Sequence, residues 1–324
     1  MQLDRLTLGR MAKKLGFVRD TLEKVSRLAD VLKFMESDEF LAKWIALKGG
    51  TAINLTIFDL PRLSVDIDLD YCGSIDRGEM LVHRDVIAEK IGKYMSANGY
   101  TLSPKSKKYH ALDSFVYEYA NCGGVKDNLK IEINYMLRCH VLPIAKREVQ
   151  LPWSEESLRV FSIAPLEIFA SKIVALLTRT APRDLYDIHN MVRYGLFDES
   201  EEEMLRKCVV FYSAIGAEQP PERFEMDHIG KISARQIKRD LEPVLRKGER
   251  FDLESVQQEV REYLSSVLIP TTEEKLFWKA FGEGSYEPGR IFGDSGEFEN
   301  IAKHPMALWK CRDKAEDVGI LDFH

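Results

Sequence analysis

Residues 63–71 restrict the fold of this chain more than any other segment. Apolar and polar residues alternate strictly here, and the polar positions are Ser64, Asp66, Asp68 and Asp70. Such alternation is typical of a strand with one buried face, because successive side chains of a strand point to opposite sides. The pattern predicts a sheet with a polar face, on which Asp66 and Asp68 lie with Cα atoms about 7 Å apart.

Helical and extended patterns both surround this strand in the first half of the chain. Helical spacing of apolar residues predicts helices within residues 20–44 and 80–98, and two further strands are expected over 114–120 and 129–137. Pro143 and Pro152 bracket a looser stretch, and 216–230 and 282–296 are loops by composition. The second half has long helical periodicities over residues 165–179, 183–194, 201–212, 234–245 and 252–268. We therefore expect an α+β fold with a mixed domain over 1–150 and a mainly helical domain over 151–324.

Composition excludes several classes of protein. The chain has 45% hydrophobic and 30% charged residues, as expected for a globular protein, and its net charge of -6 argues against a polyanion-binding surface over the whole molecule. The five cysteines show no Cys-x-x-Cys spacing, which favours a reducing, cytoplasmic location over a disulfide framework or a zinc site. The best apolar stretch, 168–177, is about half the length of a membrane span. No membrane association is expected.

Asp66 and Asp68 are candidate metal ligands. Two carboxylates this close repel each other unless a positive charge neutralises them, and a divalent cation that prefers oxygen ligands is the usual solution. The alternative is that these residues simply form the solvent face of a half-exposed strand.

The sequence Gly49-Gly50-Thr51 precedes the acidic strand. Two glycines followed by a hydroxyl residue expose consecutive backbone N–H groups, and a helix that continues over residues 52–58 would present its N-terminus to an anion. Most such triplets are only turns. Combined with the carboxylates, however, this one indicates a triphosphate beside a metal site.

Glu132 is the candidate for a third carboxylate. In the strand around it, Lys130, Glu132 and Asn134 share one face. Three carboxylates can hold two Mg²⁺ ions, one at an attacking hydroxyl and one at the nucleotide phosphates. The alternative, which this segment taken alone favours, is an amphipathic strand without catalytic function.

The helical half contributes a second group of charged residues. Lys172 interrupts an apolar helix, where a lysine either reaches solvent or meets an anion such as a phosphate. Asp184 and Asp187 follow Pro182 near a helix start, where acidic residues also stabilise the helix dipole. Tyr186 can either stack on a base or pack in the core.

These segments together resemble the four ordered motifs of the AbiEii/AbiGii-type nucleotidyltransferase toxins, which belong to the DNA polymerase beta-like superfamily. The resemblance runs from Lys48 to Tyr194. Its motifs read Lys48-Gly-Gly-Thr-Ala-Ile-Asn-Leu, Arg62-Leu-Ser64-Val-Asp66-Ile-Asp68, Lys130-Ile-Glu132, and Lys172 with Arg183-Asp184-Leu-Tyr-Asp187. The family often has Asp at the position of Glu132.

The resemblance implies a metal-dependent transfer of NMP from an NTP. It assigns the metals to Asp66, Asp68 and Glu132, and catalysis to these three residues and Lys172. The implied nucleotide-binding residues are Gly49, Gly50, Thr51, Arg62, Ser64, Lys130, Lys172, Arg183, Asp184 and Asp187. The implied cofactor is Mg²⁺, as two ions.

The resemblance also implies partners. Family members typically act as toxins paired with an antitoxin, and some transfer nucleotides to the 3′ end of tRNA, so an RNA acceptor is expected here. Three basic clusters give modest support, although such charges are usually a solvated face: Lys105, Lys107 and Lys108; Arg235, Lys238 and Arg239; and Arg246, Lys247 and Arg250. The alternatives are an acceptor that is a small molecule or a protein, and a nucleotide-binding module without activity.

Overall fold

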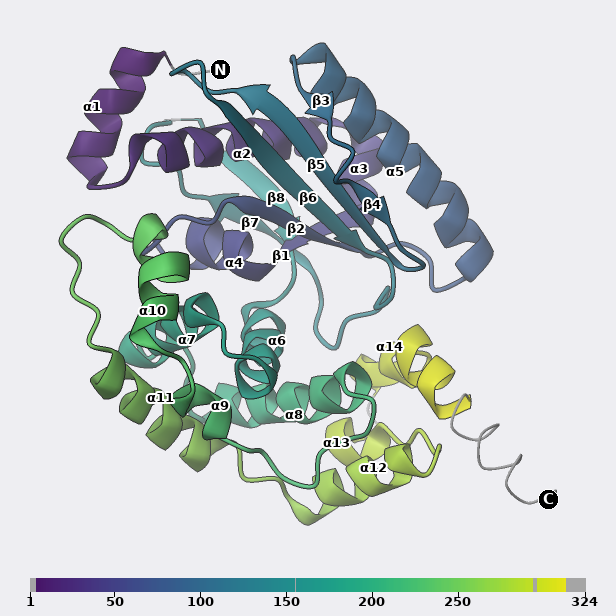
Figure 1. Ribbon diagram of the computed structural model, residues 1–324. Helices are drawn as coiled ribbons and strands as arrows, with labels where there is room; N and C mark the ends of the chain where they lie inside the picture. The colour runs from purple at the N-terminus through teal and green to yellow at the C-terminus, as the bar shows by residue number, and fades with distance from the viewer. Residues whose placement is uncertain (1–3, 155, 294–295, 313–324) are drawn as a thin grey trace. The chain divides into compact units, whose positions relative to one another are not determined.

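The computed structural model describes residues 4–154, 156–293 and 296–312 of the chain (Figure 1). It divides into two compact units. Unit 1 comprises Met1–Arg138, Ile144–Ile163 and Arg239–Arg250, and unit 2 comprises Cys139–Pro143, Ala164–Lys238 and Phe251–His324. The chain therefore passes between the units several times, whereas the sequence predicted a single boundary at residue 150.

Unit 1 contains a mixed sheet and several helices. Its helical segments are α1 (Arg5–Leu15), α2 (Arg19–Ser37), α3 (Glu39–Trp44), α4 (Gly49–Ala52), the π-helical η1 (Ile53–Ile57), α5 (Arg77–Ala97) and the 3-10 segment η3 (Glu242–Val244). Its strands are β1 (Ile45–Lys48), β2 (Asp66–Tyr71), β3 (Thr101–Leu102), β4 (Lys107–Lys108), β5 (Leu112–Ala120), β6 (Lys126–Asn134), β7 (Ala145–Val149) and β8 (Leu158–Ser162).

The eight strands form one sheet with the order β3-β5-β6-β2-β1-β8-β7, and β4 also pairs with β5. The pairs β2–β6 and β1–β8 are parallel, whereas the other pairs are antiparallel. The acidic strand β2 is thus central, with β6 on one side and β1 on the other.

One face of this sheet is apolar and is covered by α2 and α5 (Figure 1). Asp113 of β5 lies opposite Ile133 on this face and forms an ion pair of 2.7 Å with Arg84 of α5. Lys24 of α2 pairs with Asp127 of β6 at 2.8 Å. The buried side chains of β2 and β6 on this face are Ile67, Leu69, Tyr71, Leu129, Ile131 and Ile133. The opposite face carries Asp66, Asp68 and Glu132, as the alternation predicted.

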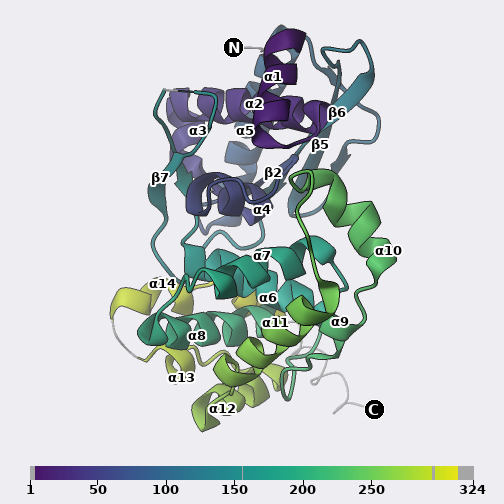
Figure 2. The same cartoon turned by 90° about the vertical axis from the view of Figure 1, so that its left-hand side faces the viewer.

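Unit 2 is helical. Its segments are α6 (Pro165–Thr178), α7 (Pro182–Arg193), α8 (Glu199–Gly216), α9 (Asp227–Gly230), α10 (Ala234–Gln236), α11 (Leu253–Val267), α12 (Thr272–Gly282), α13 (Gly289–Phe292), η4 (Gly296–Phe298) and α14 (Glu299–Ala302). Helix α6 packs against α7 and α8, and α11 packs against α7 (Figure 2). Together with unit 1 this gives the expected α+β fold.

Four segments differ from the sequence prediction. The expected helix over 234–245 is broken into α10, the π-helical η2 (Ile237–Leu241) and η3, because Pro243 has no N–H for an α-helical ladder. The looser stretch between Pro143 and Pro152 contains β7, a polar strand that pairs with β8. The expected loops over 216–230 and 282–296 contain α9 and α13, although residues 294–295 lie outside the described residues.

No helix in the described part of the chain is long and apolar enough to cross a membrane.

Candidate active site

The polar face of the sheet brings the predicted carboxylates into register with basic residues. Asp66 and Asp68 of β2 are both half-buried. Asp66 lies opposite Lys130 of β6, and Asp68 lies opposite Glu132. On the other side of β2, Lys48 of β1 also lies opposite Asp68. Lys48, Asp68 and Glu132 therefore form a row across three strands, with Asp66 and Lys130 in the next row.

Lys130 provides positive charge beside these carboxylates. Its ammonium lies 2.8 Å from the Glu132 carboxylate. Burial lowers the pKa of Lys130, but the hydrogen bond to Glu132 and the charges of Asp66 and Asp68 outweigh it and raise this pKa above its ordinary value. Lys130 is therefore a fixed cation in the site at neutral pH.

Gly49 and Gly50 lie directly against the polar side chains of the site. Gly49 has a φ of +67°, and a Cβ at this position would lie 2.5 Å from Oδ2 of Asp68. A Cβ on Gly50 would lie 2.8 Å from a guanidinium nitrogen of Arg62 and 3.0 Å from Oγ of Ser64. Only glycine fits at both positions without displacing these groups. The structure thus brings Gly49, Gly50, Arg62, Ser64 and Asp68 together.

Thr51 is fully buried, and its hydroxyl is used within the protein. It donates a hydrogen bond to the backbone carbonyl of Asp66 and lies 3.0 Å from Oγ of Ser64. Thr51 therefore fastens the Gly-Gly turn to the start of β2.

Asn54 and Lys48 belong to this site but were not among the predicted site residues. The Asn54 amide donates to the carbonyl of Gly50 at 2.7 Å and accepts from the N–H of Arg62 at 3.3 Å. The Lys48 ammonium forms an ion pair with the buried carboxylate of Asp70. Two features of the sequence could have indicated them: Asn54 is a polar residue within an apolar run, and Lys48 directly precedes the Gly-Gly pair.

The donor set on β2 fits a divalent cation. Asp66 and Asp68 present carboxylate oxygens from one strand face, the ligand type that Mg²⁺ prefers. Glu132, the predicted third ligand, contacts Lys130. Among the described side chains, no group of three or more His, Cys, Asp or Glu is arranged as a metal-binding cluster.

Three predicted residues of unit 2, Lys172, Asp184 and Asp187, form a largely buried cluster. The ammonium of Lys172 in α6 lies 2.6 Å from Asp184 and 3.1 Å from Asp187, both in α7. The guanidinium of Arg179 binds the second oxygen of Asp184 at 2.9 Å. Burial raises the pKa of Asp184, but Lys172 and Arg179 outweigh it and lower this pKa below its ordinary value.

Two other residues of this motif are placed differently. Arg183 is half-buried in the first turn of α7. Tyr186 is 3% exposed, with its ring centroid 5.8 Å from that of Phe251. Of the two expected roles for Tyr186, the structure supports packing in the core.

The three basic clusters differ in how their side chains are used. Arg246 bonds to the carbonyls of Leu15 and Leu60, both at 3.1 Å, so it is a structural residue. Arg239 pairs with its neighbour Asp240 at 2.6 Å. The remaining cluster, Lys105, Lys107 and Lys108, is exposed at the edge of the sheet.

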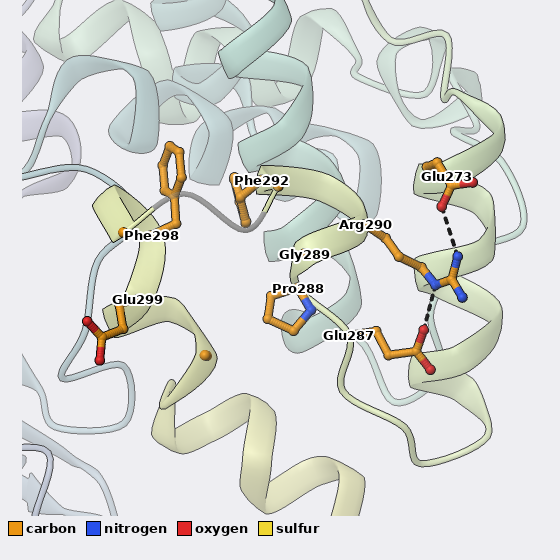
Figure 3. A pocket seen from close by; sticks show the side chains of 11 residues that line it. Glu273, Glu287, Pro288, Gly289, Arg290, Phe292, Phe298 and Glu299 are labelled. Carbon is orange, nitrogen blue, oxygen red and sulfur yellow. Dashed lines mark hydrogen bonds and ion pairs between the residues drawn. The ribbon is translucent and has the colours of Figure 1, made fainter.

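Unit 2 also contains a cavity of about 680 Å³ (Figure 3). Arg290 lies there between Glu273 and Glu287, at 2.8 and 2.5 Å (Figure 3). Glu299 also lines the cavity, which is therefore net acidic and unsuited to a triphosphate. None of the predicted site residues lines it.

Comparison with solved structures supports the fold. The chain is similar to MenT4, a nucleotidyltransferase toxin from Mycobacterium tuberculosis H37Rv, with a TM-score of 0.62, 14% identity, and coverage of 94% of this chain and 99% of that chain. A CdnC:HORMA-deltaN complex from E. coli MS115-1 matches with 16% identity over 92% of this chain and 99% of that chain, but its TM-score of 0.25 supports no structural argument. None of the curated proteins matches the sequence.

A family model gives a more direct result. The model described as "Nucleotidyl transferase AbiEii toxin, Type IV TA system" matches residues 33–270, which include every predicted site residue. Because this match spans more than half of the 324 residues, the chain is a nucleotidyltransferase and belongs to the AbiEii toxin family of type IV toxin–antitoxin systems.

Proposed function

We propose that this nucleotidyltransferase transfers a nucleoside monophosphate from an NTP to a hydroxyl of an RNA acceptor, at the 3′ end of tRNA, in a Mg²⁺-dependent reaction. The observation that carries this proposal is the approach of the Gly49–Gly50 turn to Asp68. A Cβ on Gly49 would lie 2.5 Å from the Asp68 carboxylate. Backbone N–H groups suited to phosphates therefore lie beside carboxylates suited to a cation.

Asp66 and Asp68 would hold the divalent cation. When bound, such a cation neutralises phosphate charge and lowers the pKa of an attacking hydroxyl. Phosphoryl transfer depends mainly on positioning and on electrostatic stabilisation. Within this chain, Gly49 and Gly50 let the backbone approach the phosphates closely, and Lys130 supplies a fixed positive charge next to both carboxylates.

Arg62 and Ser64 complete the proposed nucleotide site of unit 1. Arg62 is 1% exposed and donates to the carbonyl of Leu63 at 3.0 Å, so its guanidinium is held rigidly beside Gly50. In this proposal, Arg62 and Ser64 fix the Gly-Gly turn, while Glu132 keeps Lys130 in position through their ion pair.

In unit 2, we assign Lys172 to the nucleotide phosphates. Its ammonium is held by Asp184 and Asp187, so its position is determined before a ligand arrives. Arg183 belongs to the same proposed nucleotide-binding group, with Asp184 and Asp187 as the residues that orient Lys172.

The test is an incorporation assay. Purified protein is incubated with Mg²⁺, total bacterial tRNA and each of the four α-labelled NTPs in turn. We expect labelled tRNA from the wild type and, because Asp66→Asn removes a metal-binding charge, at least a hundredfold less from this variant. Asp85→Asn, at an exposed position of α5, is the matched control and should retain full activity.

The outcomes separate the candidate functions. Label on tRNA with Asp66→Asn as active as the wild type would remove the site assignment. Pyrophosphate release with label on a small molecule or a protein would replace the RNA acceptor. NTP binding without pyrophosphate release would indicate an inactive nucleotide-binding module.

We also propose that the chain acts as the toxin of a pair with an antitoxin. Induced expression should then arrest bacterial growth, and the Asp66→Asn variant should permit growth at the same protein level. Equal arrest by both chains would show that toxicity does not depend on the transferase site.

A further inference from the structure

The edge of the sheet beyond β5 continues the face that carries the carboxylates. Lys107 of β4 lies opposite Ser114 of β5, and Ser114 lies opposite Glu132. Glu132 in turn lies opposite Asp68. Because residues opposite each other in a ladder point to the same face, Lys107 shares a row with Asp68. Strand spacing places the backbone of Lys107 about 15 Å from that of Asp68, three strands away.

Tyr109 is two residues after Lys107 and is the next residue of the hairpin on the same face. Its N–H donates to the carbonyl of Leu112 at 2.8 Å, so it is opposite Leu112, which lies opposite Asn134 of β6. The Tyr109 side chain is 52% exposed. An exposed aromatic ring thus accompanies Lys105 and Lys107, which are also exposed.

The turn that carries Tyr109 is held rigidly from the other side of the sheet. Arg84 of α5 donates to the carbonyls of Tyr109 at 2.6 Å and His110 at 2.8 Å. The same guanidinium pairs with the fully buried Asp113. The hydrogen bond to Asp113, followed by the charge of this residue, raises the pKa of Arg84. The hairpin is therefore ordered without a ligand, which lowers the entropic cost of binding one.

The charge of Lys105 acts on one acidic residue of this face, Glu118, which also has two other partners. Glu118 of β5 forms an ion pair with Lys126 at 2.7 Å and accepts a hydrogen bond from Ser103 at 2.9 Å. The positive charge of Lys105 and Lys107 is thus only partly offset along the edge.

We propose that the β4–β5 hairpin binds the single-stranded end of the RNA acceptor, with Lys105 and Lys107 on its phosphates and Tyr109 stacked on a base. Lysines that follow a nucleic-acid backbone, combined with an exposed aromatic ring, are the usual means of binding a single strand. An acidic protein would use the lysines but would have no need of a flat exposed ring. This inference rests on the proposed function, because it identifies where that site receives its acceptor.

The test measures RNA affinity and transfer kinetics separately. Tyr109→Ala should weaken binding of fluorescein-labelled tRNA about tenfold or more, whereas Tyr109→Phe, which keeps the ring, should bind as the wild type does. The double variant Lys105→Ala/Lys107→Ala should also weaken binding and should reduce the magnitude of the slope of log affinity against log salt by about 1.4, as expected for two phosphate contacts to a single strand. In both weakened variants, KM for tRNA should rise while the affinity for NTP stays unchanged.

Lys13→Ala/Lys14→Ala is the matched control, because it removes the same charge from an exposed pair in α1 of the same unit. It should retain the tRNA affinity of the wild type. If the hairpin variants bind tRNA like the wild type while transfer to tRNA continues, the hairpin proposal is wrong and the proposed function stands. If the wild type binds NTP but neither binds nor labels tRNA, both the RNA acceptor and the hairpin proposal are wrong.

Discussion

At the residue scale, the space at Gly49 matters more than its backbone angle. Gly49 and Gly99 both have positive φ values, +67° and +80°. A Cβ would meet the Asp68 carboxylate at Gly49, whereas nothing lies within 4 Å of a Cβ at Gly99. Alanine substitutions at these two glycines therefore distinguish two effects: both strain the backbone, but only the one at Gly49 also places a methyl group in the site.

We expect Gly49→Ala to lose at least a hundredfold in turnover, because the new methyl group displaces Asp68. Gly99→Ala should lose about 1–2 kcal/mol of stability through the same backbone strain but keep its activity per folded molecule. Pyrophosphate release measures the turnover, and urea unfolding measures the stability. Wild-type turnover in Gly49→Ala would show that the turn does not contact the reacting groups.

The ion pairs of Asp184 make the stability of unit 2 depend on pH. The pKa of this residue is lower in the folded protein than in the unfolded chain, so its carboxylate stabilises the fold above the unfolded pKa of about 4. This contribution is lost as the pH falls through the lower, folded pKa. Asp184→Asn leaves Lys172 buried with one carboxylate fewer, and we expect a loss of about 3 kcal/mol at pH 7.

Urea unfolding between pH 7 and pH 2 tests this expectation. The free energy of unfolding should fall less steeply below about pH 4 in Asp184→Asn than in the wild type. Glu203→Gln removes the exposed pair of Glu203 with Lys207, 2.7 Å apart, and should cost less than about 0.5 kcal/mol. Equal losses of unfolding free energy in Asp184→Asn and Glu203→Gln would show that the buried ion pairs of Asp184 stabilise the fold no more than an exposed pair does.

At the element scale, a buried carboxylate attaches residues 139–143 to the helices of unit 2. Glu167, in the first turn of α6, accepts hydrogen bonds from the N–H groups of Val141 at 2.9 Å and Leu142 at 2.8 Å. The hydroxyl of Tyr212 in α8 also donates to it. Three elements thus meet at one side chain that is 1% exposed.

Glu167→Gln should destabilise the protein by about 2 kcal/mol, because an amide N–H then faces a backbone N–H. Tyr212→Phe removes one donor and should cost about 1 kcal/mol. Chemical denaturation followed by circular dichroism measures both values. A Gln variant as stable as the wild type would mean that the segment is held by other contacts.

Elements were predictable from the sequence where a local pattern specified them. The strict alternation around Asp66 and the helical spacing in α2, α5, α6 and α7 depend only on neighbouring residues. Strand β1 has four residues, and β7 is polar, so neither has a local pattern. Both exist because other strands pair with them, which a sequence pattern does not show.

At the scale of the whole molecule, residues 239–250 are distant in sequence from the rest of unit 1 but belong to it. The N–H of Leu63 donates to the carbonyl of Val244 at 2.8 Å, immediately before the acidic strand. The N–H of Lys247 donates to the carbonyl of Gly16 at 2.6 Å. This segment therefore supports both the helical N-terminus and the entry to β2.

A chain that ends at Ile163 should consequently unfold at a lower temperature and less cooperatively than the full chain, because Leu63 and its neighbours become exposed. Residues 239–250, joined to that chain by a flexible linker, should restore much of the difference. Thermal unfolding followed by circular dichroism compares the three chains. Identical melting of the shortened and full chains would show that the segment adds no stability.

The sequence alone determined the polar strand face with Asp66 and Asp68, the Gly-Gly turn before it and the sheet-then-helix order, because each follows from local periodicity and residue chemistry. It also carried the ordered motifs that identify the family. Only the tertiary structure decided which side chains meet: Lys130 with Glu132, Lys48 with Asp70, and Lys172 with Asp184. These pairs depend on strand register and helix packing, which are set by the burial of apolar faces from segments far apart in the chain.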